Sequence, residues 1–339
     1  MHPIEIFALW KFGKYDLNTL KNFNEEFECL EEVCKSKFFE LERIDFDAVK
    51  RFADEQIEQA EKKGIKVLSL WSEDYPPLLK EIASPPIVLF YLGDAELLKR
   101  DCISIVGTRR MTSYGKKVAH QIAFTVAQAG IVVVSGLAFG IDSCAHSAAL
   151  EAGGKTIAVL GTGVDVPYPV SNRKIYEKIV QDGCVVSEFP LGTKAMKQNF
   201  PMRNRIIAGL SRATVVVEAP KDSGALITAR FAVDMGRDVF AVPADIDRSS
   251  SEGCNWLLKM GAIPLTDPSQ LLDHYGLKSE SSEEKDGFFD IFSKGPLYFD
   301  EIVNLLGVEP SQVLMLLTEY ELSGKITKLE DGRYHKLGR

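Results

Sequence analysis

Short apolar runs alternate with amphipathic stretches through the middle of the chain. The apolar runs are bounded by turn-forming residues, as buried parallel strands are, and cover 102–106, 131–135, 156–160, 184–187, 214–217 and 239–242. Between them, helical spacing predicts helices near 114–129, 142–152, 172–182, 203–211 and 224–236. This alternation predicts an α/β fold, an extended Rossmann-like, doubly wound and mostly parallel sheet.

The segment before this region follows another pattern. Apolar residues recur at helical spacing, at Leu20, Phe23, Phe27 and Leu30, so a small helical domain is expected over 1–64. Apolar runs at 66–70 and 87–92 predict two strands that lead into the sheet. The Rossmann-like domain is therefore expected over 65–275.

The segment after the sheet begins with a charged, Ser-rich stretch over 276–287 that lacks apolar anchors and predicts a linker. Over 288–339 the pattern predicts a winged helix, with helices and strands at 288–292, 299–306, 310–323, 326–329 and 333–336. Residues 285–339 have a net charge of −2, and the third helix carries Glu319 and Glu321. We expect a protein-contact or autoregulatory role for this domain, with duplex binding as the alternative.

Composition is that of a globular protein, with 45% hydrophobic and 26% charged residues among 339. The apolar stretch 4–10 is too short to span a bilayer and lacks the flanks of a signal peptide, so we expect a cytoplasmic protein without a membrane segment. The cysteines are scattered without a CxxC pair, which predicts reduced thiols and no metal site; they are Cys29, Cys34, Cys102, Cys144, Cys184 and Cys254.

The net charge of −8 would argue against nucleic acid, but the charge is unevenly distributed. Residues 101–275 carry 18 basic and 16 acidic side chains, a balance of +2. Two stretches in this region, 102–141 and 189–217, contain no acid at all and hold nine cations. They are Arg109, Arg110, Lys116, Lys117, Lys194, Lys197, Arg203, Arg205 and Arg212. Such clusters indicate a local site for a polyanion.

The loops that follow the predicted strands carry groups suited to phosphate. Arg109 and Arg110 follow the first parallel strand. The second strand leads into a Gly-rich loop before a helix, whose amides could hold an anion. Its candidate residues are Ser135, Gly136, Leu137, Ala138 and Gly140, and we expect Asp142 to act as a helix cap or as the partner of an arginine.

Later loops add further candidates. Arg173, Lys174 and Tyr176 combine cations with an aromatic ring, an arrangement that holds a backbone and stacks a base. Arg203, Asn204 and Arg205 are expected in the first turn of a helix, where an anion would have to compensate the cations. A further helix start offers small donors at Ser223, Gly224 and Thr228.

Two nucleotide-binding motifs fail on context. The segment 149–156 ends like a phosphate-binding P-loop, but Ala149 replaces its first Gly and the flanking elements are reversed. Gly161-Thr162-Gly163 begins like a dinucleotide motif, but prolines follow and no helix opens. We therefore expect no cofactor.

Several ordered segments resemble the DNA processing protein A (DprA/Smf) family. They are IVGTRRMTSYG at 105–115, SGLAFGIDSCAH at 135–146, TIAVLGTGVDVPYPVSN at 156–172, FPMRNRIIAGLS at 200–211, VVEAPKDSGALITA at 216–229 and VFAVPADI at 239–246. The N-terminal helices resemble the sterile-alpha-motif-like domain of this family, and the tail resembles its winged helix.

The resemblance implies a non-enzymatic homodimer, joined through the Rossmann-like domain, that binds and protects single-stranded DNA. It also implies loading of RecA recombinase during DNA uptake in natural transformation or during recombination. The family's DNA contacts fall on Arg109, on the 135–140 loop and on Arg173, Lys174 and Tyr176.

A nucleotide phosphoribohydrolase-like enzyme on the same fold is the alternative. Such enzymes resemble this chain but carry a PGGxGTxxE block whose Glu acts in catalysis, and the matching region here has no carboxylate within three residues after Thr228. Glu188 and Glu218 end strands without a paired acid, and His146 has no apparent nucleophile beside it. We expect all three to be structural.

Overall fold

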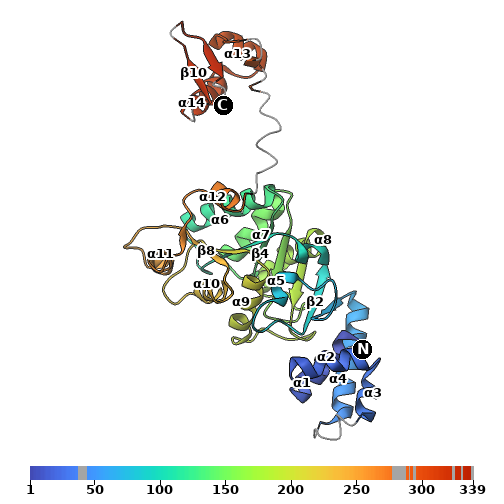
Figure 1. Ribbon diagram of the computed structural model, residues 1–339. Coiled ribbons are helices and arrows are strands. Elements are labelled where there is room, and N and C mark those ends of the chain that lie inside the picture. The colour runs from blue at the N-terminus through green and yellow to red at the C-terminus, as the bar shows by residue number, and fades with distance from the viewer. Residues whose placement is uncertain are drawn as a thin grey trace. The chain divides into compact units, whose positions relative to one another are not determined.

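A computed structural model describes residues 1–36, 44–276, 288–289, 291–292, 295–322, 325–329 and 331–336. The chain forms two compact units, residues 1–277 and 278–339 (Figure 1). The predicted linker at 276–287 lies outside the described residues except for Gly276. Each unit is described by itself.

The first unit is built on a nine-stranded sheet with the order β1-β2-β6-β5-β4-β3-β7-β8-β9. Every neighbouring pair from β6 to β9 in this order is parallel, whereas β1 and β2 add antiparallel strands at one edge. The strands are β1 (Lys66–Ser69), β2 (Val88–Gly93), β3 (Cys102–Val106), β4 (Val132–Ser135), β5 (Thr156–Val159), β6 (Cys184–Ser187), β7 (Ala213–Val216), β8 (Asp238–Ala241) and β9 (Ile263–Pro264). The predicted doubly wound, mostly parallel sheet is confirmed.

Helices cover both faces of this sheet, which explains why the central strands are apolar throughout. On β4, Val132 and Val134 pack in one core cluster while Val133 packs in another. The first cluster takes side chains from α5 (Pro77–Lys80), α9 (Asn199–Gly209), α10 (Gly224–Asp234) and α11 (Glu252–Lys259). The second takes them from α6 (Ser113–Gln128), α7 (Ile141–Glu151) and α12 (Ser269–His274).

The N-terminal helices form the region predicted before residue 64. They are α1 (Pro3–Gly13), α2 (Leu17–Glu26), α3 (Leu30–Lys35) and α4 (Phe46–Lys63). Gly64 ends α4 with a φ of 63°, a left-handed conformation that glycine adopts without strain. Phe7 meets Phe90 of β2 edge-on at 6.0 Å, so these helices share a core with the sheet. The domain boundary at 64 therefore stays a prediction.

The second unit has its own apolar core, which includes Phe288, Ile302 and Leu317. It contains α13 (Phe299–Leu306), α14 (Pro310–Leu322) and the antiparallel pair β10 (Ile326–Lys328) and β11 (Tyr334–Lys336). Leu297 pairs with Tyr334 and adds a third short strand position. This arrangement is a winged helix; the helix predicted at 288–292 falls partly on residues outside the described ones.

Candidate functional site

The site lies at the switch point of the sheet, where β3 neighbours both β4 and β7. In doubly wound sheets, ligands bind at the carboxyl ends of the strands at this point. A pocket of about 680 Å³ opens there. It is lined by the loop after β3, the start of α9 and the start of α10, including Gly107, Thr108, Arg109, Arg110, Lys197, Phe200, Asn204, Ser223, Gly224 and Thr228.

Arg109 and Arg110 are exposed on the loop after β3, as predicted. Two hydrogen bonds to Glu218, which follows β7, fix this loop. The Thr108 amide donates to the Glu218 carbonyl at 2.7 Å, and the Thr112 amide donates to its carboxylate at 2.9 Å. Within the described residues, neither arginine side chain has a hydrogen-bond or ion-pair partner, so both cations face the pocket unneutralised by direct pairing.

An aromatic surface beside these cations was missed by the sequence analysis. The Arg109 guanidinium lies 5.3 Å from the centre of the Phe200 ring, and the Tyr168 ring is 5.5 Å from Phe200. Tyr168 is 40% exposed, and Lys197 lines the same pocket. The signal for Lys197 was present in the acid-free stretch, but no sequence pattern brings Tyr168 to Phe200, since Tyr168 lies in the loop after β5 and Phe200 in the first turn of α9.

Helix α9 begins one turn earlier than predicted, at Asn199. Pro201 lies in its first turn, where a missing amide proton costs nothing because those amides have no partner within the helix. The prediction that Arg203 and Arg205 occupy the first turn is therefore wrong. The anion expected to compensate them is, for Arg205, the Glu188 carboxylate of the protein itself, whereas Arg203 donates to backbone carbonyls, so the prediction that these two arginines bind a ligand phosphate is not supported.

Arg203 is only 3% exposed and acts inside the protein. Its guanidinium donates to the carbonyls of Gly136, at 2.8 Å, and Val159. Burial lowers the pKa of Arg203 to about 10, opposed by the nearby Asp142 carboxylate. This arginine supports the loop after β4 and offers little to a ligand.

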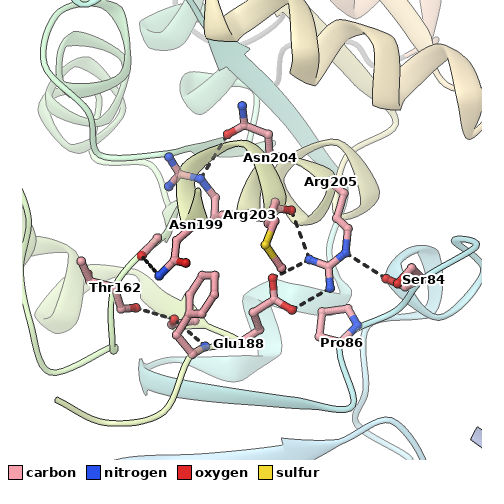
Figure 2. Close-up of polar contacts among 12 residues, drawn as sticks. Ser84, Pro86, Thr162, Glu188, Asn199, Arg203, Asn204 and Arg205 are labelled. Carbon is pink, nitrogen blue, oxygen red and sulfur yellow. Dashed lines mark hydrogen bonds and ion pairs between the residues drawn. The ribbon is translucent and has the colours of Figure 1, made fainter. Parts of the chain in front are cut away.

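Arg205 is held by an ion pair and a carbonyl (Figure 2). Its two terminal nitrogens meet the two Glu188 oxygens at 2.6 Å each, and its Nε donates to the Ser84 carbonyl at 3.0 Å. The two side chains are 14% and 13% exposed. The structural role expected for Glu188 is confirmed, and Arg205 shares it.

The Gly-rich loop after β4 differs from its prediction. Ser135 is buried and donates to the Ile105 carbonyl at 2.6 Å, and Leu137 is buried with a φ of 56°. The amides of Gly136 and Ala138 donate to the Asp142 carboxylate at 3.2 and 3.4 Å. These two amides are therefore not free for a phosphate, although Ala138 still lines the pocket.

Gly140 precedes α7 with a φ of 80° and packs closely against the loop after β3. A Cβ at this position would collide with the Thr108 and Arg109 backbone. Asp142 does not cap α7 as expected, because its carboxylate accepts from amides of the preceding loop; the Arg203 guanidinium is close enough to influence its charge, but no ion pair joins the two side chains among the described residues.

Helix α8 (Arg173–Asp182) carries the next predicted group. Arg173 and Lys174 are exposed at its start, and Arg173 pairs with Glu177 at 2.9 Å. Tyr176 packs against the core, and its hydroxyl donates to the Val164 carbonyl at 2.8 Å. Burial raises the pKa of Tyr176 to about 12. None of the three lines the pocket, and Tyr176 is not placed to stack a base.

The start of α10 faces the pocket. The Ser223 hydroxyl caps the helix by accepting from the Ala225 amide, and a Cβ at Gly224 would meet open space. Asn204 donates to the Gly224 carbonyl at 3.2 Å, and Thr228 is buried in the wall. These residues come together as predicted.

His146 is fully buried, and its Nδ1 lies 2.7 Å from the Thr156 hydroxyl. Burial lowers the pKa of His146 to about 3, so the ring is neutral and held in the core, as expected. All six cysteines are free. In the part of the chain that the structure describes, no group of three His, Cys, Asp or Glu side chains could hold a metal ion. Over the same residues, no helix is long and apolar enough to cross a membrane.

A doubly wound sheet with a cationic, aromatic pocket at its switch point defines a Rossmann-like binding protein. The family of DNA recombination-mediator protein A matches residues 66–276, and the DprA winged helix domain matches residues 277–332. The chain therefore belongs to the DprA/Smf family of recombination mediators.

Relatives support the assignment along most of the chain. Protein Smf of Synechocystis sp. is 40% identical over 284 residues, which cover 78% of this chain and 71% of that protein. DNA processing protein DprA of Streptococcus pneumoniae is 44% identical over 207 residues, covering 61% and 73%. The crystal structure of the Streptococcus pneumoniae protein superposes with a TM-score of 0.69 at 35% identity, covering 80% of this chain and 98% of that one.

DNA processing protein A from Helicobacter pylori superposes with a TM-score of 0.57 at 30% identity. The superposition covers 62% of this chain and 95% of that one. That structure is described as giving insight into a single-stranded DNA binding mode of the Helicobacter pylori protein.

Proposed function

We propose that this chain binds single-stranded DNA in the pocket at the switch point of its sheet. The observation that carries the proposal is the combination, in one pocket, of cations that lack an ion-pair partner among the described residues with one exposed and one partly buried aromatic ring. Arg109, Arg110 and Lys197 lie beside Phe200 and Tyr168 in one pocket. Cations hold phosphates of any sequence, and aromatic faces stack unpaired bases, so the combination suits a single strand better than a duplex.

The proposed contact surface is narrower than the set predicted from the sequence. It keeps Arg109, Arg110, Ser223 and Gly224 and adds the rings. Arg203 and Arg205 are left out of the contact surface, because their guanidinium groups already donate to other residues of the protein and stabilise its fold. Arg173 and Lys174 remain a second, exposed cationic position on α8 that a longer strand could reach.

The test is a titration of the full chain with fluorescent oligo-dT at several salt concentrations, with duplex of the same length as competitor. We expect affinity to fall with salt, and duplex to compete more weakly than the single strand. Equal competition by the duplex, or no binding at low salt, would overturn the proposal.

A role beyond binding follows from the family. We infer that the bound strand is passed to RecA recombinase during DNA uptake or recombination. A direct test compares the rate at which RecA assembles on oligonucleotides coated by single-strand-binding protein, with and without this chain. An unchanged rate at saturating concentration would remove this role while leaving strand binding intact.

A homodimer is proposed through the free edge of the sheet. Among the described residues β9 pairs only with β8, and Trp256 and Met260 lie one helical turn apart, 51% and 66% exposed. An unpaired edge beside exposed apolar side chains is a typical surface for self-association. Sedimentation of Trp256→Glu against the wild type tests it; a variant that stays dimeric would contradict this surface.

For the winged helix we propose contact with protein rather than with duplex DNA. α14 has no lysine or arginine, and Leu314 and Met315 are exposed on it. Such a helix lacks the cations that a phosphate-rich groove requires. The test measures duplex binding by two variants, Leu314→Ser on α14 and Lys328→Ala on β10. Duplex binding that the first variant retains and the second loses would instead favour a nucleic-acid role for the wing.

The phosphoribohydrolase-like alternative gains no support from the site. Glu188 is paired with Arg205, and Asp142 accepts from loop amides, so neither is free to act on a substrate. Release of free base from nucleoside monophosphates by the purified chain would restore the alternative.

A further inference from the structure

The loops after β5 and β6 both contribute to the pocket and are bonded to each other. The loop after β5 brings Tyr168 to the pocket, and the loop after β6 brings Ala195 and Lys197. The Gly163 amide of the first loop donates to the Thr193 carbonyl of the second at 2.9 Å. A displacement of one loop would therefore disturb the other.

Asp165 precedes Tyr168 in the loop after β5 and connects both loops to the N-terminal helices. Its Oδ1 accepts from the Gly192 amide of the loop after β6 at 2.9 Å. Its Oδ2 accepts from the ammonium group of Lys63, the last residue of α4. The Asp165 side chain is 7% exposed, whereas that of Lys63 is 45% exposed. One mostly buried carboxylate thus joins α4 to both loops.

Helix α4 makes a second polar contact with the loop after β6. The Gln56 side-chain oxygen accepts from the Leu191 amide at 2.7 Å, and Gln56 is only 5% exposed. Val164 and Leu191, one from each loop, belong to the core cluster that also contains Val49 of α4. Breaking such a buried hydrogen bond would leave a backbone donor unsatisfied, so α4 fixes the backbone of these loops.

The ring that these contacts fix is the exposed one of the pocket. Tyr168 is 40% exposed, and its ring lies 5.5 Å from that of Phe200 in the first turn of α9. A ring that is already held in place loses less conformational entropy when a base stacks on it than a mobile ring does. Contacts that immobilise the loop therefore increase affinity for a base without touching it.

We propose that Asp165 is a positioning residue for strand binding, which couples α4 to the loop after β5 and so holds the Tyr168 ring in place for a base. This inference rests on the proposed binding of a strand in the pocket. Within the described residues, α4 does not line the pocket. Strand affinity nevertheless depends on this helix, through the contact between Lys63 and Asp165.

The test is a double-mutant cycle on the full chain, with oligo-dT affinity measured by fluorescence anisotropy at one salt concentration. Asp165→Ala removes both contacts of the carboxylate and should weaken binding about fivefold, the lower end of what one stacked base contributes. In a Tyr168→Ala background the same substitution should weaken binding less than about twofold, because the ring that Asp165 positions is gone. A merely structural role would weaken binding by the same factor in both backgrounds.

Lys63→Ala and Lys62→Ala form a matched pair, since the two lysines are neighbours at the end of α4. Lys62 pairs with Glu58 of its own helix and its side chain is 70% exposed, so its loss removes the same charge without releasing a loop. We expect Lys62→Ala to bind like the wild type. Lys63→Ala should bind about two- to fivefold more weakly, the range that a partly exposed ion pair contributes.

Three results would overturn the inference: wild-type affinity in a folded Asp165→Ala variant, equal losses in the two backgrounds, or equal affinities of Lys63→Ala and Lys62→Ala. If Asp165→Ala does not fold, the lysine pair decides. Failure of the proposed function gives a different result. A wild type that does not bind oligo-dT, or a Tyr168→Ala variant that binds as well as the wild type, would refute the proposed pocket and the inference with it.

Discussion

Replacing Arg109 with alanine is the sharpest test of the proposed interface. The side chain is exposed in the pocket and lies over the Phe200 ring, and within the described residues it makes no hydrogen bond or ion pair. Its removal should therefore leave the fold intact. A charge-assisted contact at an exposed rim contributes about 1 to 2 kcal/mol, so we expect oligo-dT affinity to fall by a factor of about 5 to 30.

The salt dependence of oligo-dT affinity gives a second, independent measure of the lost Arg109 contact. Each neutralised phosphate of a single strand contributes about 0.7 to the slope of log affinity against log salt. When salt rises from about 50 to about 200 mM, the factor by which oligo-dT affinity falls should therefore be about 2.6 times smaller for the variant, which has lost one contact, than for the wild type. Fluorescence anisotropy at both salt concentrations measures the two quantities on the same samples.

Arg230→Ala is the matched control, since Arg230 lies on α10 outside the pocket lining and its side chain is 84% exposed. It removes the same charge from the same domain. If Arg109→Ala and Arg230→Ala give equal affinities and slopes, the pocket is not the strand-binding site and the reasoning from free cations fails.

Three further predictions follow from the same structure. Arg205→Ala leaves the mostly buried Glu188 carboxylate without its partner. Urea unfolding should show a free energy of unfolding lower by about 2 kcal/mol, a value between those for exposed and for buried ion pairs. A decrease no larger than that caused by Arg230→Ala would contradict this prediction. The pKa of His146 is about 3 in the folded chain and 6.5 in the unfolded chain. Below pH 6.5 the unfolded chain therefore binds a proton that the folded chain does not bind, and the free energy of unfolding decreases as the pH falls. The loss should be about 2 kcal/mol between pH 7.5 and 5, and a folded His146→Gln variant should show a pH dependence weaker by that amount. Phe200→Ala should weaken oligo-dT binding by about 1 to 3 kcal/mol at an unchanged salt slope, because stacking involves no ion release; a changed slope would show that the ring acts through Arg109.

The sequence by itself determined the sheet and the place of the pocket. The alternation of apolar runs and helical stretches depends only on local spacing, and the strand ends follow from it, so Arg109 and Arg110 could be placed at the carboxyl edge. The short elements α11, α12 and β9 were missed, since they are too brief to show a period. The start of α9 was misjudged by one turn because proline at the start of a helix resembles a break before it.

Only the tertiary structure decided which polar groups are available to a ligand. Arg109 and Arg205 belong to equally acid-free stretches, yet Arg109 has no ion-pair partner within the described part of the chain while Arg205 is bound by Glu188. Likewise the amide of Thr112 is taken by Glu218, more than a hundred residues away. A cation or amide binds an outside anion only when no internal partner lies within hydrogen-bond distance, and folding sets that distance between residues far apart along the chain.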